Sequence, residues 1–304
     1  MSSAVTVDHL LTFIAAADEG SFSAAGRKLN RAQSVVSHTL AHLEGQLGVQ
    51  LFDRSSRKPS LTEHGRSLLA EARAVAGSLD HFKARAKSLN DGLEAEVAVV
   101  VDVMFPIEVL TAAVIAFQAE FPNTPLRLYV EALGAVLQPV LNGQVAFGIM
   151  GSLPMAPPEL TRERVLGVRM EMVASPDHPL AAYEGRIPRR VLDLHIQLVL
   201  TDRSPLTYGR EFGVLAPKTW RLADLGAKLA FLRAGLGWGS MPFAAIKHDL
   251  AEGRLTRLAL EESTREFVMP MSVVYPTASP PGPASRWLVN RLKQEAEPHE
   301  AMSA

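Results

Sequence analysis

The chain has 304 residues, which is longer than one ordinary domain, and no run approaches the roughly 20 apolar residues of a membrane-spanning helix. The absence of cysteine excludes disulfides, zinc sites built on thiolates and thiol redox sensing. A net charge of -1 excludes a surface that binds nucleic acid throughout, although it allows one basic module.

The first 90 residues predict helices almost throughout. A first helix ends near Gly20, and no basic residue precedes it, so we expect a cytoplasmic protein without a secretory signal. Ser21 or Ser23 would cap a second helix over 24–29, and a third helix is predicted over 33–47. The first helix has an apolar face of Leu10, Leu11, Phe13 and Ile14. The expected buried stripe of the third is Val35, Val36, Leu40, Leu43 and Leu47.

An extended stretch over 50–61 leads into a long predicted helix that starts at Thr62. Its apolar positions alternate three and four apart, which is typical of a helix that buries a narrow seam against a partner. These positions are Leu68, Leu69, Ala72, Val75, Ala76, Leu79, Phe82, Ala86 and Leu89. The pattern also fits a core helix of one domain, but a length of roughly 27 residues, about 40 Å, favours a dimerising linker.

After residue 92 the composition changes, because runs rich in β-branched residues now alternate with helical patterns. Strands are predicted over 97–101, 126–130, 145–150, 171–175 and 197–201, and helices over 107–121 and 223–234. This alternation predicts an α/β domain with largely parallel sheets. The methionines at 170, 172, 269 and 271 alternate within strands, and we interpret them as packing residues.

Basic side chains gather in two places of the N-terminal part. No acidic residue lies between Glu19 and Glu44, a gap that contains Arg27, Lys28 and Arg31, and a second cluster follows over 54–58. Phosphate neutralisation at such clusters gives salt-dependent affinity for DNA.

The start of the third predicted helix is polar on one side. Gln33 can pair with adenine through a donor and an acceptor, and Ser37 can bond a base or a phosphate. An exposed polar helix face is often simply solvated surface. The spacing alone therefore fits both a DNA-binding helix and an ordinary surface helix.

A long motif over residues 21–65 resembles the N-terminus of LysR-type transcriptional regulators. The matching positions are Ser21-Phe22-Ser23-Ala24-Ala25, Leu29, Gln33-Ser34, Ser37, Leu43-Glu44, Leu47-Gly48, Leu51-Phe52, Arg54, Leu61-Thr62 and Gly65. The resemblance implies a winged helix-turn-helix that binds double-stranded DNA at an interrupted palindromic operator. The implied DNA-binding residues are Ser23, Arg31, Ala32, Gln33, Ser34, Ser37, His38, Arg54, Arg57, Lys58 and Thr62.

A looser likeness continues to the C-terminus, through Phe121-Pro122, Asn142-Gly143, His178-Pro179-Leu180-Ala181, Gly235-Leu236-Gly237 and Met241-Pro242. It implies a two-lobed α/β domain like that of periplasmic binding proteins, with an effector between the lobes and crossover strands near 159–167 and 266–275. The expected architecture is multidomain: an all-α winged helix-turn-helix (5–62), a dimerising linker helix (63–91) and an effector-binding domain (92–297). Lobe I would span about 92–162 and 268–297, and lobe II about 163–267.

Two positions depart from the family pattern. His38 stands where family members often have arginine, and a neutral imidazole would weaken a phosphate contact there. Ala146 stands where relatives usually have aspartate, which would remove a contact between lobes or one that orders a loop.

The expected effector is largely apolar or aromatic, because the loops predicted to face the cleft are apolar there. The expected effector-binding residues are Met104, Phe105, Leu133, Thr201, Asp202, Arg203, Ser204, Trp220 and Met241, with Arg203 as the charge that holds the ligand. Two other interpretations stay open. Met104 and Phe105 could be core residues, with Arg203 paired to Asp202 on a surface loop. Trp220 could likewise be a core residue. Homodimers or homotetramers and a contact with RNA polymerase complete the expected partners.

Other classes fit less well. A two-lobed solute-binding protein without a DNA role is the alternative, but it would need a signal peptide and has no use for residues 1–90. His38 and His42 have the spacing of a zinc pair, yet Thr39 stands where a metalloprotease requires glutamate. Ser240 breaks the dinucleotide-binding pattern that starts at Gly235. We therefore expect no catalytic residue, no metal and no cofactor.

Overall fold

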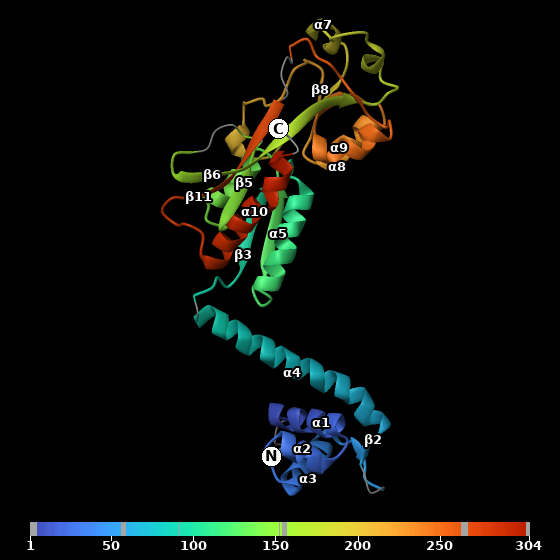
Figure 1. Ribbon diagram of the computed structural model, residues 1–304, viewed down its shortest axis with the longest axis vertical. Helices are drawn as coiled ribbons and strands as arrows, with labels where there is room; N and C mark the ends of the chain where they lie inside the picture. Colours follow the sequence, from blue (N-terminus) through green and yellow to red (C-terminus); the bar gives the residue numbers. More distant parts are fainter. Residues whose placement is uncertain are drawn as a thin grey trace. The chain divides into compact units, whose positions relative to one another are not determined.

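The computed structural model of the protein describes residues 5–55, 59–90, 92–151, 153, 157–262 and 267–301. The chain forms two compact units, Met1–Asp91 and Gly92–Ala304. No helix in these described ranges combines the length and the apolar character needed to cross a membrane. Figure 1 shows the ribbon of both units with many of their helices and strands labelled.

The N-terminal unit is a small helical bundle with a short hairpin and one long helix. Its elements are α1 (Val7–Glu19), α2 (Phe22–Lys28), α3 (Gln33–Leu47), β1 (Phe52–Asp53), β2 (Ser60–Leu61) and α4 (Glu63–Asn90). Ser21, rather than Ser23, caps α2, because its hydroxyl accepts from the Ala24 amide at 3.2 Å. Gly48 ends α3 with a left-handed φ of 70°, as expected of a glycine at this position.

Apolar side chains from all three short helices fill the core of this unit. The rings of Phe13 and Phe22 meet the Phe52 ring edge-on, with centroids 5.8 and 5.2 Å away. Val36, Leu40 and Leu43 of α3 are buried as predicted. The prediction was wrong for Val35 and Leu47, which are 47% and 40% exposed. One residue corresponds to 100° of helix, so Val36 occupies the core-facing position and turns Val35 away from it.

Two glycines allow close backbone approach in this unit. A Cβ at Gly26 would lie 2.6 Å from the Arg31 carbonyl oxygen, across the turn between α2 and α3. A Cβ at Gly65 would lie 2.2 Å from the Leu51 carbonyl oxygen, where α4 passes the residue that precedes β1. Neither distance occurs for real side chains, so both contacts depend on glycine.

The substitution Gly65→Ala is expected to lower the free energy of unfolding by about 2 kcal/mol, because the added methyl group forces the backbone of Leu51 aside. Urea denaturation followed by circular dichroism measures the change. Gly77→Ala in the same helix is the matched control, since a Cβ there meets no atom within 4 Å. The control should stabilise α4 by about 0.5–1 kcal/mol, and an equal effect of both variants would contradict the prediction.

The C-terminal unit contains a nine-stranded mixed sheet in the order β4-β3-β5-β11-β6-β9-β7-β8, with β10 paired to β6. Its strands are β3 (Val97–Asp102), β4 (Leu126–Glu131), β5 (Phe147–Met150), β6 (Leu160–Ala174), β7 (Gln197–Leu200), β8 (Thr219–Leu222), β9 (Trp238–Pro242), β10 (Thr256–Arg257) and β11 (Phe267–Pro276). The helices are α5 (Ile107–Glu120), α6 (Gly134–Leu141), α7 (Arg189–Leu192), α8 (Leu225–Arg233), α9 (Phe243–Ala251) and α10 (Pro283–Ala301), with 3-10 turns η1 (Pro179–Ala182) and η2 (Pro205–Thr207).

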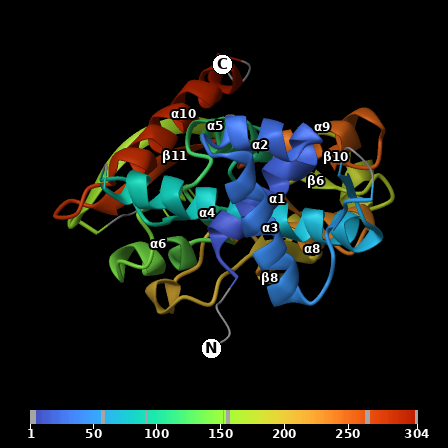
Figure 2. The ribbon, with the colours of Figure 1, turned by 90° about the horizontal axis from the view of Figure 1, so that it is seen from below.

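The first lobe consists of β3, β4 and β5 with α5, α6 and α10. Figures 1 and 2 both show α5 and α10 side by side. Successive residues of β3 point to opposite faces of the sheet. Val99 and Val101 accordingly pack in one hydrophobic cluster with residues of α5 and α10, and Val100 packs in another with α6. Helices therefore cover both faces of this part of the sheet.

The second lobe consists of β7, β8 and β9 with α7, α8 and α9. The strands β6 and β11 pair with each other over ten residues and connect the two lobes. The expectation of largely parallel sheets was therefore wrong in the middle of the sheet, where the pairs β5–β11, β11–β6 and β6–β9 are antiparallel. The reason is that β6 carries the chain out of the first lobe and β11 carries it back.

The predicted crossover over 159–167 and the predicted strand over 171–175 are parts of one strand, β6. Residue 266, the predicted start of the other crossover, lies outside the described residues.

The predicted fold class is confirmed: a winged helix-turn-helix, a long helix and a two-lobed α/β unit follow one another along the chain. The predicted limits of the two lobes stay predictions, since β6 and β11 run through both lobes without a break.

Candidate functional site

The first turn of α3 presents a row of polar groups to solvent. Ala32, Gln33, Ser34 and His38 are exposed and Ser37 is half-buried. Ala32 precedes the helix without a side-chain hydrogen bond to its first turn, so the amide groups there are not capped by a side chain. Such an uncapped N-terminus carries a partial positive charge and favours contact with an anion.

The turn between α2 and α3 holds this helix in place. The Arg31 amide donates to the Gly26 carbonyl at 2.8 Å, and Asn30 adopts a left-handed φ of 54°. The Arg31 guanidinium donates to both carboxylate oxygens of Asp8 at 2.7 and 2.8 Å. The hydrogen bond from Arg31 is the main reason that the pKa of Asp8 is lowered. Arg31 therefore connects α1 to the turn, and a phosphate would have to compete with Asp8 for it.

Glu44 fixes the start of the hairpin, a role that the sequence interpretation missed. One of its carboxylate oxygens accepts from the Leu51 and Phe52 amides at 2.8 and 3.0 Å, and the other accepts from Arg54 at 2.7 Å. The Arg54 guanidinium also lies 5.5 Å from the centroid of the Phe22 ring. The available signal in the sequence was an acidic residue in the last turns of the third predicted helix, shortly before the extended stretch.

Two further predicted DNA-binding residues make contacts within the unit. The Ser23 hydroxyl accepts from Arg27 at 3.1 Å, one turn along α2. The Thr62 hydroxyl donates to the Gln50 carbonyl at 2.6 Å and accepts from the Gly65 amide at 2.9 Å, so it caps α4. Arg57 and Lys58 lie outside the described residues. The exposed group that the structure brings together is therefore Ala32, Gln33, Ser34 and His38, beside the paired Arg31.

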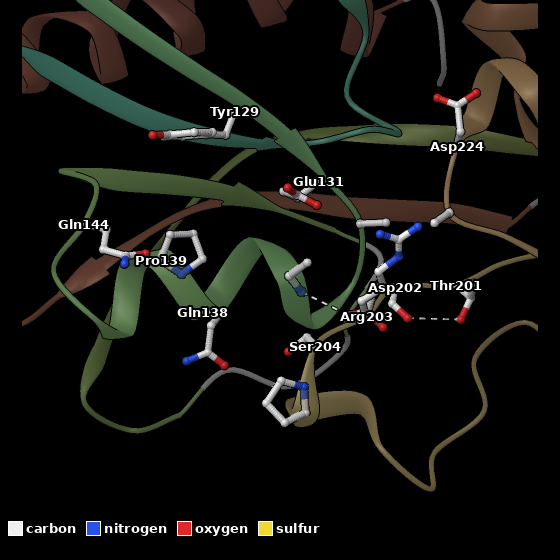
Figure 3. Close-up of a pocket in the computed structure, with 14 residues that line it drawn as sticks. Tyr129, Glu131, Gln138, Pro139, Gln144, Thr201, Asp202, Arg203, Ser204 and Asp224 are labelled. Atoms are coloured by element: carbon white, nitrogen blue, oxygen red, sulfur yellow. Dashed lines mark hydrogen bonds between the residues drawn. The ribbon is translucent and has the colours of Figure 1, made fainter.

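The C-terminal unit has an open groove of about 1000 Å³ between its two lobes. Figure 3 shows Thr201, Asp202, Arg203 and Ser204 on the side of the second lobe, opposite β4 and α6. The Asp202 carboxylate does not pair with Arg203. It accepts from the Ala135 amide in the first turn of α6 at 2.9 Å and from the Thr207 hydroxyl at 2.5 Å. Asp202 thus connects the two lobes and occupies the N-terminus of α6.

A smaller cavity of about 420 Å³ lies between the crossover strands and β7, α8 and β9. Met104 and Leu133 line it, together with Met170, Met269 and Phe212. Leu133 has a φ of 51°, a strained value for a residue with a side chain, at the point where the chain enters α6. The methionines at 170 and 269 therefore line a cavity as well as packing in the core.

The remaining predicted effector-binding residues lie apart from the linings of these two spaces. Phe105 is buried in the core of the first lobe, and Met241 is buried beneath α8 and α9. Trp220 is 45% exposed on β8, where its ring lies 6.4 Å from the Phe231 ring, so it is not a core residue. Lys228, which the sequence interpretation did not single out, lines the smaller cavity. A lysine between Leu225 and Leu232 on the buried face of a helix was the signal that could have found it.

Comparisons with known proteins agree with this division of the chain. Residues 7–66 match the family model for the bacterial regulatory helix-turn-helix protein of the lysR family, and residues 90–297 match the model for the LysR substrate binding domain. The E. coli protein YeeY, an uncharacterized HTH-type transcriptional regulator, is 29% identical over 252 residues, which cover 82% of this chain and 81% of YeeY. The HTH-type transcriptional regulator AceR of Acinetobacter baumannii is 27% identical, covering 96% of this chain and 97% of AceR.

A solved structure shows the same fold. An OxyR mutant of Corynebacterium glutamicum superposes with a TM-score of 0.56 at 22% identity, covering 99% of this chain and 96% of OxyR.

Proposed function

Because the chain belongs to the LysR family of bacterial transcriptional regulators, we propose that α3 reads an operator in double-stranded DNA and that a small molecule bound between the lobes modulates this binding. The observation that carries the proposal is the exposed, uncapped start of α3 with Gln33 and Ser34 at its tip. A gel shift with the DNA upstream of the chain's own gene tests it. Absence of binding at low salt by the folded oligomer would contradict it.

We propose that Gln33 contacts a base edge and that Arg54 stabilises the position of α3 without contacting a base. Arg54 is held by Glu44 and by the Phe22 ring, so its loss would disturb the hairpin as well as any phosphate contact. The paired Arg31, together with the amide groups at the start of α3, would bind the phosphate backbone. His38 is exposed one turn further along α3 and would face the same groove.

The substitution Gln33→Ala is expected to weaken operator binding by about 1–3 kcal/mol and to relax the preference at one base pair, because a bidentate contact with adenine is lost. Binding of single-base operator variants, measured by fluorescence anisotropy, checks both effects. Gln118→Ala, an exposed glutamine on α5 in the other unit, is the matched control and should leave binding unchanged. An equal loss on all operator variants would mean that Gln33 does not read bases.

We propose that α4 forms the dimer that places two reading helices on an interrupted palindrome. Val75 and Phe82 lie seven residues apart on this helix and are 48% and 68% exposed. A row of exposed apolar side chains at this spacing is the seam of a helix pair. Dimers would pair into tetramers through the C-terminal units, and a change in their arrangement would alter contact with RNA polymerase in the cytoplasm.

We propose that the effector is largely apolar or aromatic, as the lining of the 420 Å³ cavity favours. A two-lobed solute-binding protein without a DNA role does not account for the helix-turn-helix match over residues 7–66. The relatives are transcriptional regulators, and we propose that this chain likewise has no catalytic activity of its own.

A further inference from the structure

The smaller cavity of the C-terminal unit combines an apolar lining with a buried cation. Met104, Met170, Met269 and Phe212 form much of its wall, and its volume of about 420 Å³ exceeds the roughly 150 Å³ that is enough for benzene in an apolar cavity. Among the described residues that line it, Lys228 and Arg162 are the ones with ionisable side chains. Arg162 is exposed, and its guanidinium donates to the Ser272 hydroxyl at 3.0 Å.

Lys228 is 1% exposed, and its side chain reaches the carbonyl oxygen of a neighbouring strand. Its ammonium group donates one hydrogen bond, to the Ser240 carbonyl oxygen on β9 at 2.8 Å. Within the part of the chain that the structure describes, no carboxylate pairs with it. Burial alone lowers the pKa of Lys228 to about 8, so the side chain is still largely protonated at neutral pH. Among the described residues, two of the three ammonium donors thus have no acceptor and the buried charge has no carboxylate partner.

A plain packing role does not explain this residue. Lys228 lies on the buried face of α8, three residues after Leu225 and four before Leu232, where leucine or methionine would fill the same space without a buried charge. The lysine stem packs against the adjacent strand, where a Cβ at Gly239 would lie in van der Waals contact with the lysine Cε at 3.4 Å. The structure therefore holds a costly cation at the wall of an apolar space.

We propose that Lys228 anchors the carboxylate of a small apolar or aromatic monocarboxylic acid, whose hydrocarbon part lies against the methionines at 104, 170 and 269. The inference rests on the proposed effector role of this unit and names the chemical class of the effector. The single buried cation can pair with one carboxylate of a ligand. The apolar side chains that line the rest of the cavity can pack against an aromatic ring or a short alkyl chain. The charge that holds the ligand is then Lys228, in place of the exposed Arg203 that the sequence suggested.

Thermal-shift and calorimetric titrations of the full chain with matched pairs test the inference. The probes are benzoate, phenylacetate and hexanoate, each compared with its uncharged amide up to the solubility limit. We expect the carboxylates to bind and to raise the melting temperature more than their amides do. Lys228→Met, which keeps the apolar volume, should weaken carboxylate binding at least roughly tenfold and remove the difference between acid and amide.

Lys218→Met, an exposed lysine of the same lobe, is the matched control and should behave as wild type. Arg203→Met distinguishes the two candidate anchors. Equal binding of acids and amides, no binding of any carboxylate to the wild type, or loss in Arg203→Met but not in Lys228→Met would each overturn the inference. None of these measurements involves DNA, so a failed gel shift would contradict the proposed function and leave carboxylate binding standing.

Discussion

The double substitution Val75→Asp, Phe82→Asp is expected to convert the oligomer into species that no longer pair through α4 and to weaken operator binding at least a hundredfold. Each apolar side chain is largely exposed in the single chain, so the substitutions should leave the helix and the core of the unit intact. Two linked DNA-binding units bind an operator about 10²–10⁴ times more tightly than a single unit does. This gain in affinity disappears when the two units are no longer linked. Analytical ultracentrifugation and gel shifts measure the two effects.

The control for added charge is the double substitution Ala70→Asp, Gly77→Asp. These positions are also seven residues apart on α4 and exposed, but they lie on the opposite side of the helix from Val75 and Phe82. Both variants carry the same charge change, so repulsion from DNA should affect them alike. If the control loses as much affinity as the first variant, or if the first variant keeps its oligomeric state, α4 does not form the dimer seam.

The substitution Glu163→Ala is expected to lower the free energy of unfolding of the C-terminal unit by about 3 kcal/mol. Glu163 on β6 accepts from Tyr275 of β11 at 2.5 Å and from Arg286 and Lys293 of α10 at 2.7 and 2.5 Å. Burial by itself would raise the pKa of Glu163, but the hydrogen bonds from Lys293, Tyr275 and Arg286 outweigh it and lower the pKa to about 2. A difference of about 2.5 pKa units corresponds to about 3 kcal/mol.

The pH dependence of stability follows from the same lowered pKa. The contribution of Glu163 is complete above the pKa of the unfolded chain, near 4.5, and is lost as the pH falls from about 5 toward 2. Urea denaturation of wild type and variant should therefore differ by about 3 kcal/mol near neutral pH and converge in acid. Glu295→Ala, which removes an ion pair with Arg291 within one helix, is the control and should cost at most about 0.5 kcal/mol. A difference that does not depend on pH would contradict the assigned role.

The exposed start of α3, which we propose contacts DNA, was predictable from the sequence because its geometry is local. The start of α3 at Gln33, its end before Gly48 and the cap at Ser21 follow from residues within a few positions of one another. The linings of the two spaces in the C-terminal unit were predictable in part. Met104, Leu133 and the loop at 201–204 do line spaces between the lobes, whereas Phe105 and Met241 are buried elsewhere. A residue's distance from a cleft depends on how several strands pair, and periodicity carries no information on that pairing.

The sequence by itself determined the order of the elements, the helix-turn-helix with its exposed polar tip, and the apolar row along α4, since each depends on spacing within a single segment. Only the tertiary structure decided which side chains from distant segments meet. It joined Glu44 to Arg54 and the hairpin amides, and Glu163 to α10. It also placed Lys228 at the wall of an apolar cavity, with no carboxylate partner among the residues that the structure describes, while Arg203 is exposed to solvent. The physical reason is that the free energy of a charge depends on its burial and its partners, which are set by contacts between residues far apart in the chain.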